Sequence, residues 1–171
     1  NRAYSHIQKG QNDNAIADAG EAIRLDAKDA TAYSYRASAQ RNKQQYDNAI
    51  ADLNEALRID PKSANYFNSR GLIYLNKGEL GRAVSDLNDA VRLDPKLANA
   101  LINRADAHLR RGDYDRALED ANEAVRLNPS AYHYRIRTMA FLNKGEFDRA
   151  LGDANEAIRL EPKAAAGYGN R

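Results

Sequence analysis

The sequence contains no cysteine and no tryptophan, and it has only one methionine and four prolines. Without cysteine, the chain can form neither a disulfide framework nor a thiolate metal site. It also lacks any apolar run close to the roughly 18 residues that a membrane-spanning helix needs. We therefore predict an ordinary cysteine-free domain with no membrane insertion.

An excess of charge of either sign is missing as well. Lys plus Arg number 26 and Asp plus Glu number 24, which leaves a formal net charge of +2. Binding of nucleic acid requires clustered basic side chains. We therefore expect no nucleic-acid partner, although some helical-hairpin repeats do read RNA bases one per repeat.

What the sequence does contain is one amphipathic segment repeated five times. Copies begin with NAIADAGEAIRLDA at residue 14, and the others begin at residues 48, 82, 116 and 149. An arginine recurs with the same period of 34 residues, shortened once to 33. Its members are Arg2, Arg36, Arg70, Arg104, Arg137 and Arg171. A fixed period of this size indicates a solenoid of stacked supersecondary units.

Each period is predicted to form two helices. Residues 98–111 contain helix-forming residues and stop before Gly112, a residue that commonly ends helices. Asp113 and Asp115 then favour the start of a second helix, and Pro129 prevents its continuation. One such hairpin cannot bury its own apolar face, so the copies are expected to stack.

Small residues occupy three slots of the period. Two slots always hold alanine, and the third holds alanine, glycine or threonine. Small side chains let two helices approach closely. The slots are Ala15, Ala49, Ala83, Ala117 and Ala150, then Ala22, Ala56, Ala90, Ala124 and Ala157, then Ala3, Ala37, Gly71, Ala105 and Thr138.

With these features the chain resembles the tetratricopeptide repeat family. The matching features are the period, the two alanine slots, a glycine in the turn of four hairpins and a proline at the end of four. The glycines are Gly10, Gly78, Gly112 and Gly145, and the prolines are Pro61, Pro95, Pro129 and Pro162. The resemblance implies an all-α, right-handed superhelical solenoid of antiparallel helix pairs. It also implies a concave groove, lined by the first helix of each pair, that binds a peptide or a segment of a partner protein.

The predicted domain organisation is a single array over residues 1–171. Its periods are 1–29, 30–63, 64–97, 98–130 and 131–163, followed by the start of a further helix at 164–171. Gln44 replaces the turn glycine and Ala27 replaces the closing proline. We interpret the segment as part of a longer array. A cytoplasmic location is expected, with the periplasm as the alternative, since any targeting signal would lie outside the segment.

Arginines and aspartates alternate along the chain, and an interhelix turn separates each arginine from the next aspartate. At a rise of 1.5 Å per residue, they should lie at similar heights on successive helices. We hypothesise a structural ladder of ion pairs that joins one repeat to the next; an anion-binding stripe of arginines is the alternative. Its members are Arg36, Asp52, Arg70, Asp86, Arg104, Asp120, Arg137 and Asp153.

The resemblance places the partner-binding groove at the non-packing positions of each first helix, which vary between repeats. These positions carry amides for peptide groups, apolar side chains for pockets and arginines for acidic groups. An alternative is that Leu75, Leu109 and Leu142 pack between adjacent first helices. The predicted groove residues are Asn65, Asn68, Leu72, Asn76, Asn99, Ile102, Asp106, Arg110, Tyr132, Arg135, Met139 and Asn143.

Motifs of catalysis and cofactor binding are absent from the sequence. It contains no HExxH, GxGxxG or GxxxxGK[ST], and two of its three histidines, His6 and His108, share one repeat slot and are interpreted as packing residues. We predict no enzyme activity, no metal site and no cofactor. The predicted function is a protein–protein interaction scaffold. The alternatives are a structural array that self-assembles by end-to-end or lateral stacking, and the non-catalytic arm of a larger enzyme.

Overall fold

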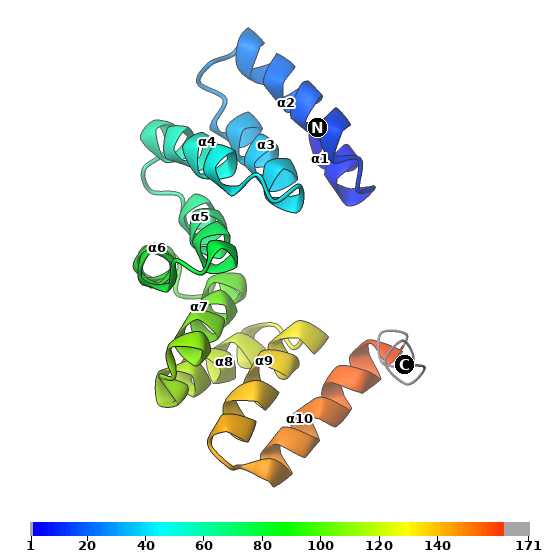
Figure 1. The fold of residues 1–171 in the computed structure, drawn as a ribbon, viewed down its shortest axis with the longest axis vertical. Coiled ribbons are helices and arrows are strands. Elements are labelled where there is room, and N and C mark those ends of the chain that lie inside the picture. Colours follow the sequence, from blue (N-terminus) through cyan, green and yellow to red (C-terminus); the bar gives the residue numbers. More distant parts are fainter. Residues whose placement is uncertain (1, 163–171) are drawn as a thin grey trace. The chain divides into compact units, whose positions relative to one another are not determined.

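A computed structural model describes residues 2–162, and within them every regular element is an α-helix (Figure 1). The chain divides into two compact units, Asn1–Asp94 and Pro95–Arg171. The all-α fold of helical hairpins predicted from the period is confirmed. Arg171 and the predicted helix start at 164–171 lie outside the described residues.

The first unit contains three consecutive hairpins. The first helix of each pair packs against its own second helix and against the second helix of the preceding pair. First helices also contact one another, α1 with α3 and α3 with α5. The elements are α1 (Arg2–Gln8), α2 (Asn12–Leu25), α3 (Ala30–Asn42), α4 (Tyr46–Ile59), α5 (Ala64–Lys77) and α6 (Leu80–Leu93).

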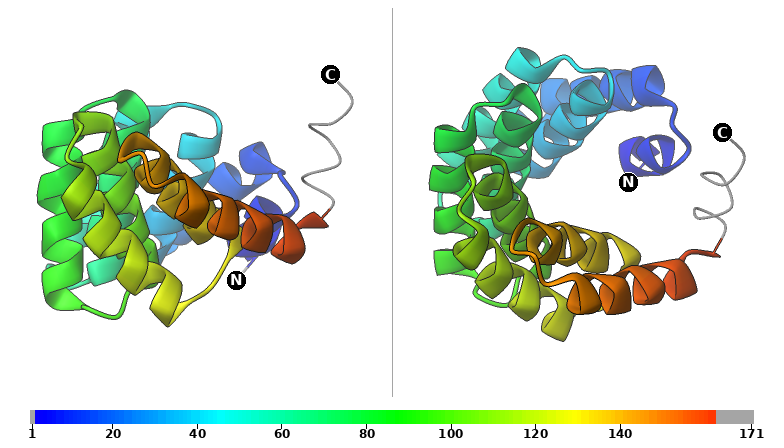
Figure 2. Two further views of the ribbon diagram at one scale, coloured as in Figure 1. Left: turned by 90° about the horizontal axis from the view of Figure 1, so that it is seen from below. Right: turned by 60° about the horizontal axis from the view of Figure 1, so that its bottom comes forward.

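The second unit contains two hairpins with the same packing. Figure 2 shows α9 beside both α8 and α10, and α9 also contacts α7. The bounds of α7 are those predicted from the sequence. The elements are α7 (Ala98–Arg111), α8 (Tyr114–Leu127), α9 (Ala131–Asn143) and α10 (Phe147–Leu160).

Left-handed backbone ends the first helix of each hairpin. Gly112 has a φ of 81°, and Gly78 has a φ of 78°. Gln44 takes the same conformation with a φ of 60°, so the turn keeps its shape although the glycine is missing. The left-handed region costs a residue with a side chain roughly 1–2 kcal/mol.

The small residues form the contact between the two helices of each hairpin. Ala49, Ala83 and Ala117 have no exposed surface at all. Gly71 has the tightest surroundings, because a Cβ atom there would lie 2.8 Å from the Leu87 Cγ atom and 3.3 Å from the Ala83 carbonyl oxygen. The small slots therefore set how closely the two helices approach.

Every hairpin carries one bidentate arginine–aspartate pair between its helices. The Nε and Nη2 atoms of Arg36 donate to the two carboxylate oxygens of Asp52 at 2.8 and 2.6 Å. The same geometry, within 2.6–2.8 Å, joins Arg2 to Asp18, Arg70 to Asp86, Arg104 to Asp120 and Arg137 to Asp153. The hydrogen bonds to Asp52 are the main cause that raises the pKa of Arg36.

The link from an arginine to the preceding hairpin runs through an asparagine. The hypothesis from the sequence had assigned this link to the preceding aspartate. Arg70 Nη1 instead donates to Asn54 Oδ1 at 2.7 Å, and Arg137 Nη1 donates to Asn122 Oδ1 at 3.0 Å. Two of the guanidinium nitrogens already hold the aspartate of their own hairpin, so the third is the one that reaches back. Gly20 occupies the equivalent position opposite Arg36.

A second ion pair joins neighbouring hairpins at the turn end. Lys77 Nζ lies 2.6 Å from Asp47 Oδ1. Lys43 pairs with Asp13, and Lys144 pairs with Asp115, in the same way. The aspartates are largely exposed, so each of these pairs contributes little to stability.

The shortened loop before α9 is held by its own polar groups. His133 is buried, and its Nδ1 atom lies 2.6 Å from the carbonyl oxygen of Asn128. The Ser130 side chain accepts a hydrogen bond from the His133 backbone N–H and caps α9. The loss of one residue in this period is thus compensated by a histidine that the other hairpins do not have.

We predict that Gly71→Ala destabilises the protein. Alanine favours helix by about 1 kcal/mol over glycine, but the added Cβ overpacks the contact with Leu87, at a cost of roughly 1–3 kcal/mol. Urea denaturation should show a net loss of about 1 kcal/mol. A variant as stable as the wild type would show that the small slots do not limit the helix approach.

Gly20→Asn is expected to stabilise the first unit. A Cβ at this position would lie 3.9 Å from Arg36 Nη1, an ordinary contact, and the new amide oxygen would accept a hydrogen bond as Asn54 does in the next hairpin. The gain should be about 1 kcal/mol.

The matched control is Gly20→Ala, measured under the same conditions. Helix propensity alone ranks alanine above asparagine. If the hydrogen bond forms, the asparagine variant is the more stable of the two. The opposite order would mean that the arginine gains nothing from an acceptor in the preceding hairpin.

Candidate partner-binding face

The first helices expose side chains that differ from hairpin to hairpin, whereas their packed side chains repeat. Both sets lie on the same helices. The Arg–Asp pair and the small slots determine which side of each first helix is packed, and the other side remains exposed. The exposed set therefore contains the first-helix side chains that remain accessible to other molecules.

In the first unit, the predicted residues on α5 are largely accessible. Asn65 and Asn76 are exposed, and Asn68 and Leu72 are half-buried. Leu75 is buried, so the alternative interpretation, packing between first helices, is the right one for this residue. The accessible part of α5 is thus rich in amides, which both donate and accept hydrogen bonds.

On α7, two predicted groove residues are not accessible, and the sequence interpretation of them is corrected. Ile102 is only 1% exposed and Asp106 only 7%. The reason is that α7 buries residues on nearly all of its sides, including three in a row from Leu101 to Asn103. Leu109 is buried too, while Asn99 and Arg110 remain exposed.

The exposed side of α9 presents a continuous stripe at helical spacing. Tyr132 is 37% exposed, Met139 and Leu142 are each 49% exposed, and Arg135 is exposed between them. Leu142 shares the repeat slot of Leu75 and Leu109, which are buried, and the first helix predicted to follow α10 at 164–171 lies outside the described residues. We call Tyr132, Arg135, Met139 and Leu142 the α9 stripe. Asn143 lies beside it, and its amide donates to the Met139 carbonyl oxygen at 2.8 Å.

Charged groups surround the Tyr132 end of the α9 stripe. The guanidinium of Arg135 lies 5.9 Å from the centre of the Tyr132 ring. Arg110 donates to both carboxylate oxygens of Asp106, at 3.0 and 2.9 Å. Burial raises the pKa of Tyr132 and the negative charge of Asp106 adds to the effect, while Arg110 and Arg135 oppose it. The phenol is therefore neutral at physiological pH and available as a hydrogen-bond donor and acceptor.

Arginines on the exposed side of first helices differ from the framework arginines in their partners. Within residues 2–162, only Arg41, Arg116 and Arg135 have no carboxylate within ion-pair distance. Arg41 is half-buried on α3, and burial lowers its pKa. Arg135 is exposed on the first helix α9, and Arg116 lies on the second helix α8.

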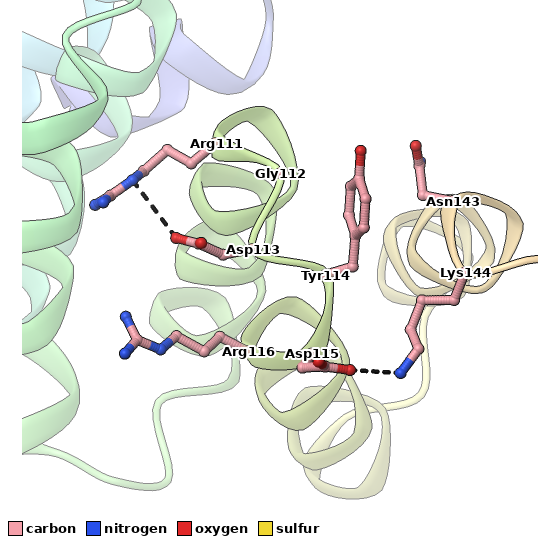
Figure 3. A pocket seen from close by; sticks show the side chains of 8 residues that line it. All are labelled: Arg111, Gly112, Asp113, Tyr114, Asp115, Arg116, Asn143 and Lys144. Atoms are coloured by element: carbon pink, nitrogen blue, oxygen red, sulfur yellow. Dashed lines mark hydrogen bonds and ion pairs between the residues drawn. The ribbon is translucent and has the colours of Figure 1, made fainter.

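A separate surface pocket of about 550 Å³ lies at the turn end of the second unit (Figure 3). Tyr114 and Asn143 point the same way, and in this view Asp115, Arg116 and Lys144 lie below them. Lys144 pairs with Asp115, and Arg111 Nε lies 3.6 Å from Asp113. Of the residues that line this pocket, only Asn143 belongs to the groove predicted from the sequence.

The described residues also bear on the sequence predictions about metal-binding and titratable side chains. Residues 2–162 contain no group of three or more histidine, aspartate or glutamate side chains placed to hold a metal ion. His108 is buried, and burial lowers its pKa, so it is neutral at physiological pH. His108 packs beside the Arg104–Asp120 pair, in keeping with its interpretation as a packing residue.

None of the helices described here combines the length and apolar character needed to cross a membrane. No curated protein sequence matches the chain. Solved structures are similar to it over nearly its whole length. A crystal structure of MamA has 21% identity and a TM-score of 0.76, covering 97% of this chain and 98% of MamA.

Two other similar structures are of TPR proteins. TTC0263, a thermophilic TPR protein in Thermus thermophilus, has 21% identity and a TM-score of 0.83, covering 94% of this chain and 89% of its own. YrrB, described as a TPR protein with an unusual peptide-binding site, has 22% identity and a TM-score of 0.69, covering 94% and 84%. At these identities the likeness shows the fold.

Family models also match the sequence of the chain. Those described as tetratricopeptide repeat match residues 1–29 and 68–132, and one described as TPR repeat matches residues 37–78. The matched residues include the turn glycines Gly10, Gly78 and Gly112 and the alanine slots up to Ala124. The chain belongs to the tetratricopeptide repeat family.

Proposed function

We propose that this protein is a non-catalytic interaction module that binds a peptide or a segment of a partner protein along the exposed side of its first helices. One observation carries the proposal. The side chains that join helix to helix repeat from hairpin to hairpin, whereas the exposed side chains on the same helices do not. This difference is expected if the packed side chains build the array and the exposed side chains contact a ligand.

The exposed side chains suit a polypeptide ligand. Asn65 and Asn76 offer amides that can pair with backbone N–H and C=O groups of any sequence. Met139 and Leu142 offer apolar surface, and methionine adapts to partners of different shape. A combination of backbone recognition and apolar anchors is how extended segments are commonly bound.

The similar structures support the same class of function. YrrB is described as having a peptide-binding site, and it covers most of this chain with the same fold. We propose a peptide-binding role for this protein partly by analogy with YrrB. The chemical class of the ligand is inferred from the residues of this chain.

A second candidate function, self-association, is favoured by the exposed side of α10. Phe147, Leu151 and Ile158 follow one another at helical spacing and are all more than half exposed. Leu151 is 63% exposed, whereas Leu118 in the same slot of α8 is 9% exposed because α9 covers α8. These exposed side chains give α10 an apolar surface that a second copy of the chain would be able to cover.

The proposed function is tested with the double variant Met139→Ala/Leu142→Ala. Peptides that bind the wild type are first selected from a random display library of about 12 residues, a length that spans such a groove when extended, and their affinities are measured by fluorescence anisotropy. Removing two half-exposed apolar side chains should weaken binding about tenfold or more. Melting should be unchanged, since both side chains face away from the core.

Leu25→Ala serves as the control for this experiment. Leu25 is even more exposed, but it lies at the end of the second helix α2. Its replacement should leave peptide affinity unchanged. Equal affinities for the wild type and the double variant would place the binding surface elsewhere.

Self-association is tested by sedimentation velocity over a concentration series, comparing the wild type with Leu151→Glu. If α10 mediates pairing, the average mass rises with concentration in the wild type, and the charged variant remains a monomer. A wild type that is monomeric at every concentration would eliminate this candidate.

A further inference from the structure

The α9 stripe combines an arginine that lacks a carboxylate partner with two exposed apolar side chains. In residues 2–162 nearly all arginines contact a carboxylate, and Arg135 is one of three that do not. We infer that the segment bound by this protein is acidic, with a carboxylate on Arg135 beside a large apolar side chain on Met139 and Leu142. This inference rests on the proposed function and adds the chemical class of the ligand.

Arg135 has the surroundings of a ligand contact rather than of a framework residue. The framework arginines give two nitrogens to an aspartate of their own hairpin, and Arg70 and Arg137 give a third to an asparagine. Arg135 lies over an aromatic ring as Arg36 and Arg137 do, 5.9 Å from the centre of Tyr132, but among the described residues no carboxylate lies within ion-pair distance of it. A guanidinium held against an aromatic ring keeps its planar donor edge open for a bidentate carboxylate.

The charge near the stripe is positive after the internal pairs are taken into account. Arg110 is matched by Asp106, which leaves the charge of Arg135 without a match in the cluster around Tyr132. Arg41 on α3 also lacks a carboxylate within ion-pair distance among the described residues, but it is half-buried and donates to Asn42 Oδ1 at 3.2 Å. The formal charge of the whole chain is only +2, so the unmatched charge of Arg135 on the exposed side of α9 is a local feature and not a consequence of a basic protein.

The apolar half of the stripe selects among the anions that could bind. A free inorganic anion would make no use of Met139 and Leu142, and a nucleic acid would require a cluster of basic side chains. Arg135 and Met139 are four residues apart on one helix, which separates them by about 6 Å along its axis. In an extended ligand that distance corresponds to about two residues. The expected ligand therefore has Asp or Glu about two positions from Leu, Met, Ile or Phe.

The test is a display selection, with the same random peptide library, on three forms of the full chain. These are the wild type, Arg135→Gln and the control Arg116→Gln. The control removes the same charge from an arginine that also lacks a carboxylate partner but lies on the second helix α8. Displayed peptides carry no phosphate, so any preference for acid is a preference for carboxylate.

Wild type and Arg116→Gln are expected to select peptides enriched in Asp or Glu near a large apolar residue, and Arg135→Gln is expected to lose the acidic enrichment. The best wild-type peptide should bind Arg135→Gln about tenfold more weakly by fluorescence anisotropy. The difference should shrink as salt is raised. Binding to Met139→Ala/Leu142→Ala should be weakened at all salt concentrations.

The outcomes separate this inference from the proposed function. Peptides that depend on Met139 and Leu142 but show no acidic preference would overturn the inference and leave the proposed function in place. An acidic preference lost equally in Arg116→Gln would also overturn it, because net charge would then explain the result. Failure to select any peptide would contradict both.

Discussion

A buried carboxylate sits in the second helix of every hairpin from α4 onwards, and its neutralisation by an arginine of the first helix determines the rest of the structure. Asp52, Asp86, Asp120 and Asp153 are buried, and each accepts two hydrogen bonds from one guanidinium. A buried pair of this kind adds little net stability compared with apolar packing, but a wrong register would leave a charge without a partner. The pair therefore mainly fixes how the two helices of a hairpin are aligned with each other. The small slots then allow these two helices to approach closely.

This register also separates the packed from the exposed side of each first helix. With the Arg–Asp pair fixed, the side chains three and four positions from the arginine lie on the same packed side of the helix, and the side chains opposite them point outwards. The α9 stripe lies on the outward side, next to the residues that hold α9 in place. Variation in the exposed positions therefore changes the surface chemistry without disturbing the packing, as the proposed interaction module would require.

Sequence reasoning predicted the helices and the framework more fully than the candidate site. The bounds of α7 and the Arg–Asp partners followed from residue spacing, because period and helix geometry fix them. The exposed positions followed less well. Ile102 and Asp106 share the slots of Arg135 and Met139, yet the first two are buried and the last two are exposed. Side chains at equivalent positions of two repeats point in the same direction, but they do not have the same neighbouring side chains.

The sequence by itself determined the fold class, the hairpin boundaries and the framework, since these depend on periodicity and on local signals such as the turn glycine. Only the tertiary structure decided which equivalent positions remain accessible and which nitrogen reaches back to Asn54 or Asn122. It also decided which arginines have no carboxylate partner. Accessibility and ion pairing depend on side chains that approach from other helices, and a single position in the sequence carries no information about those distances.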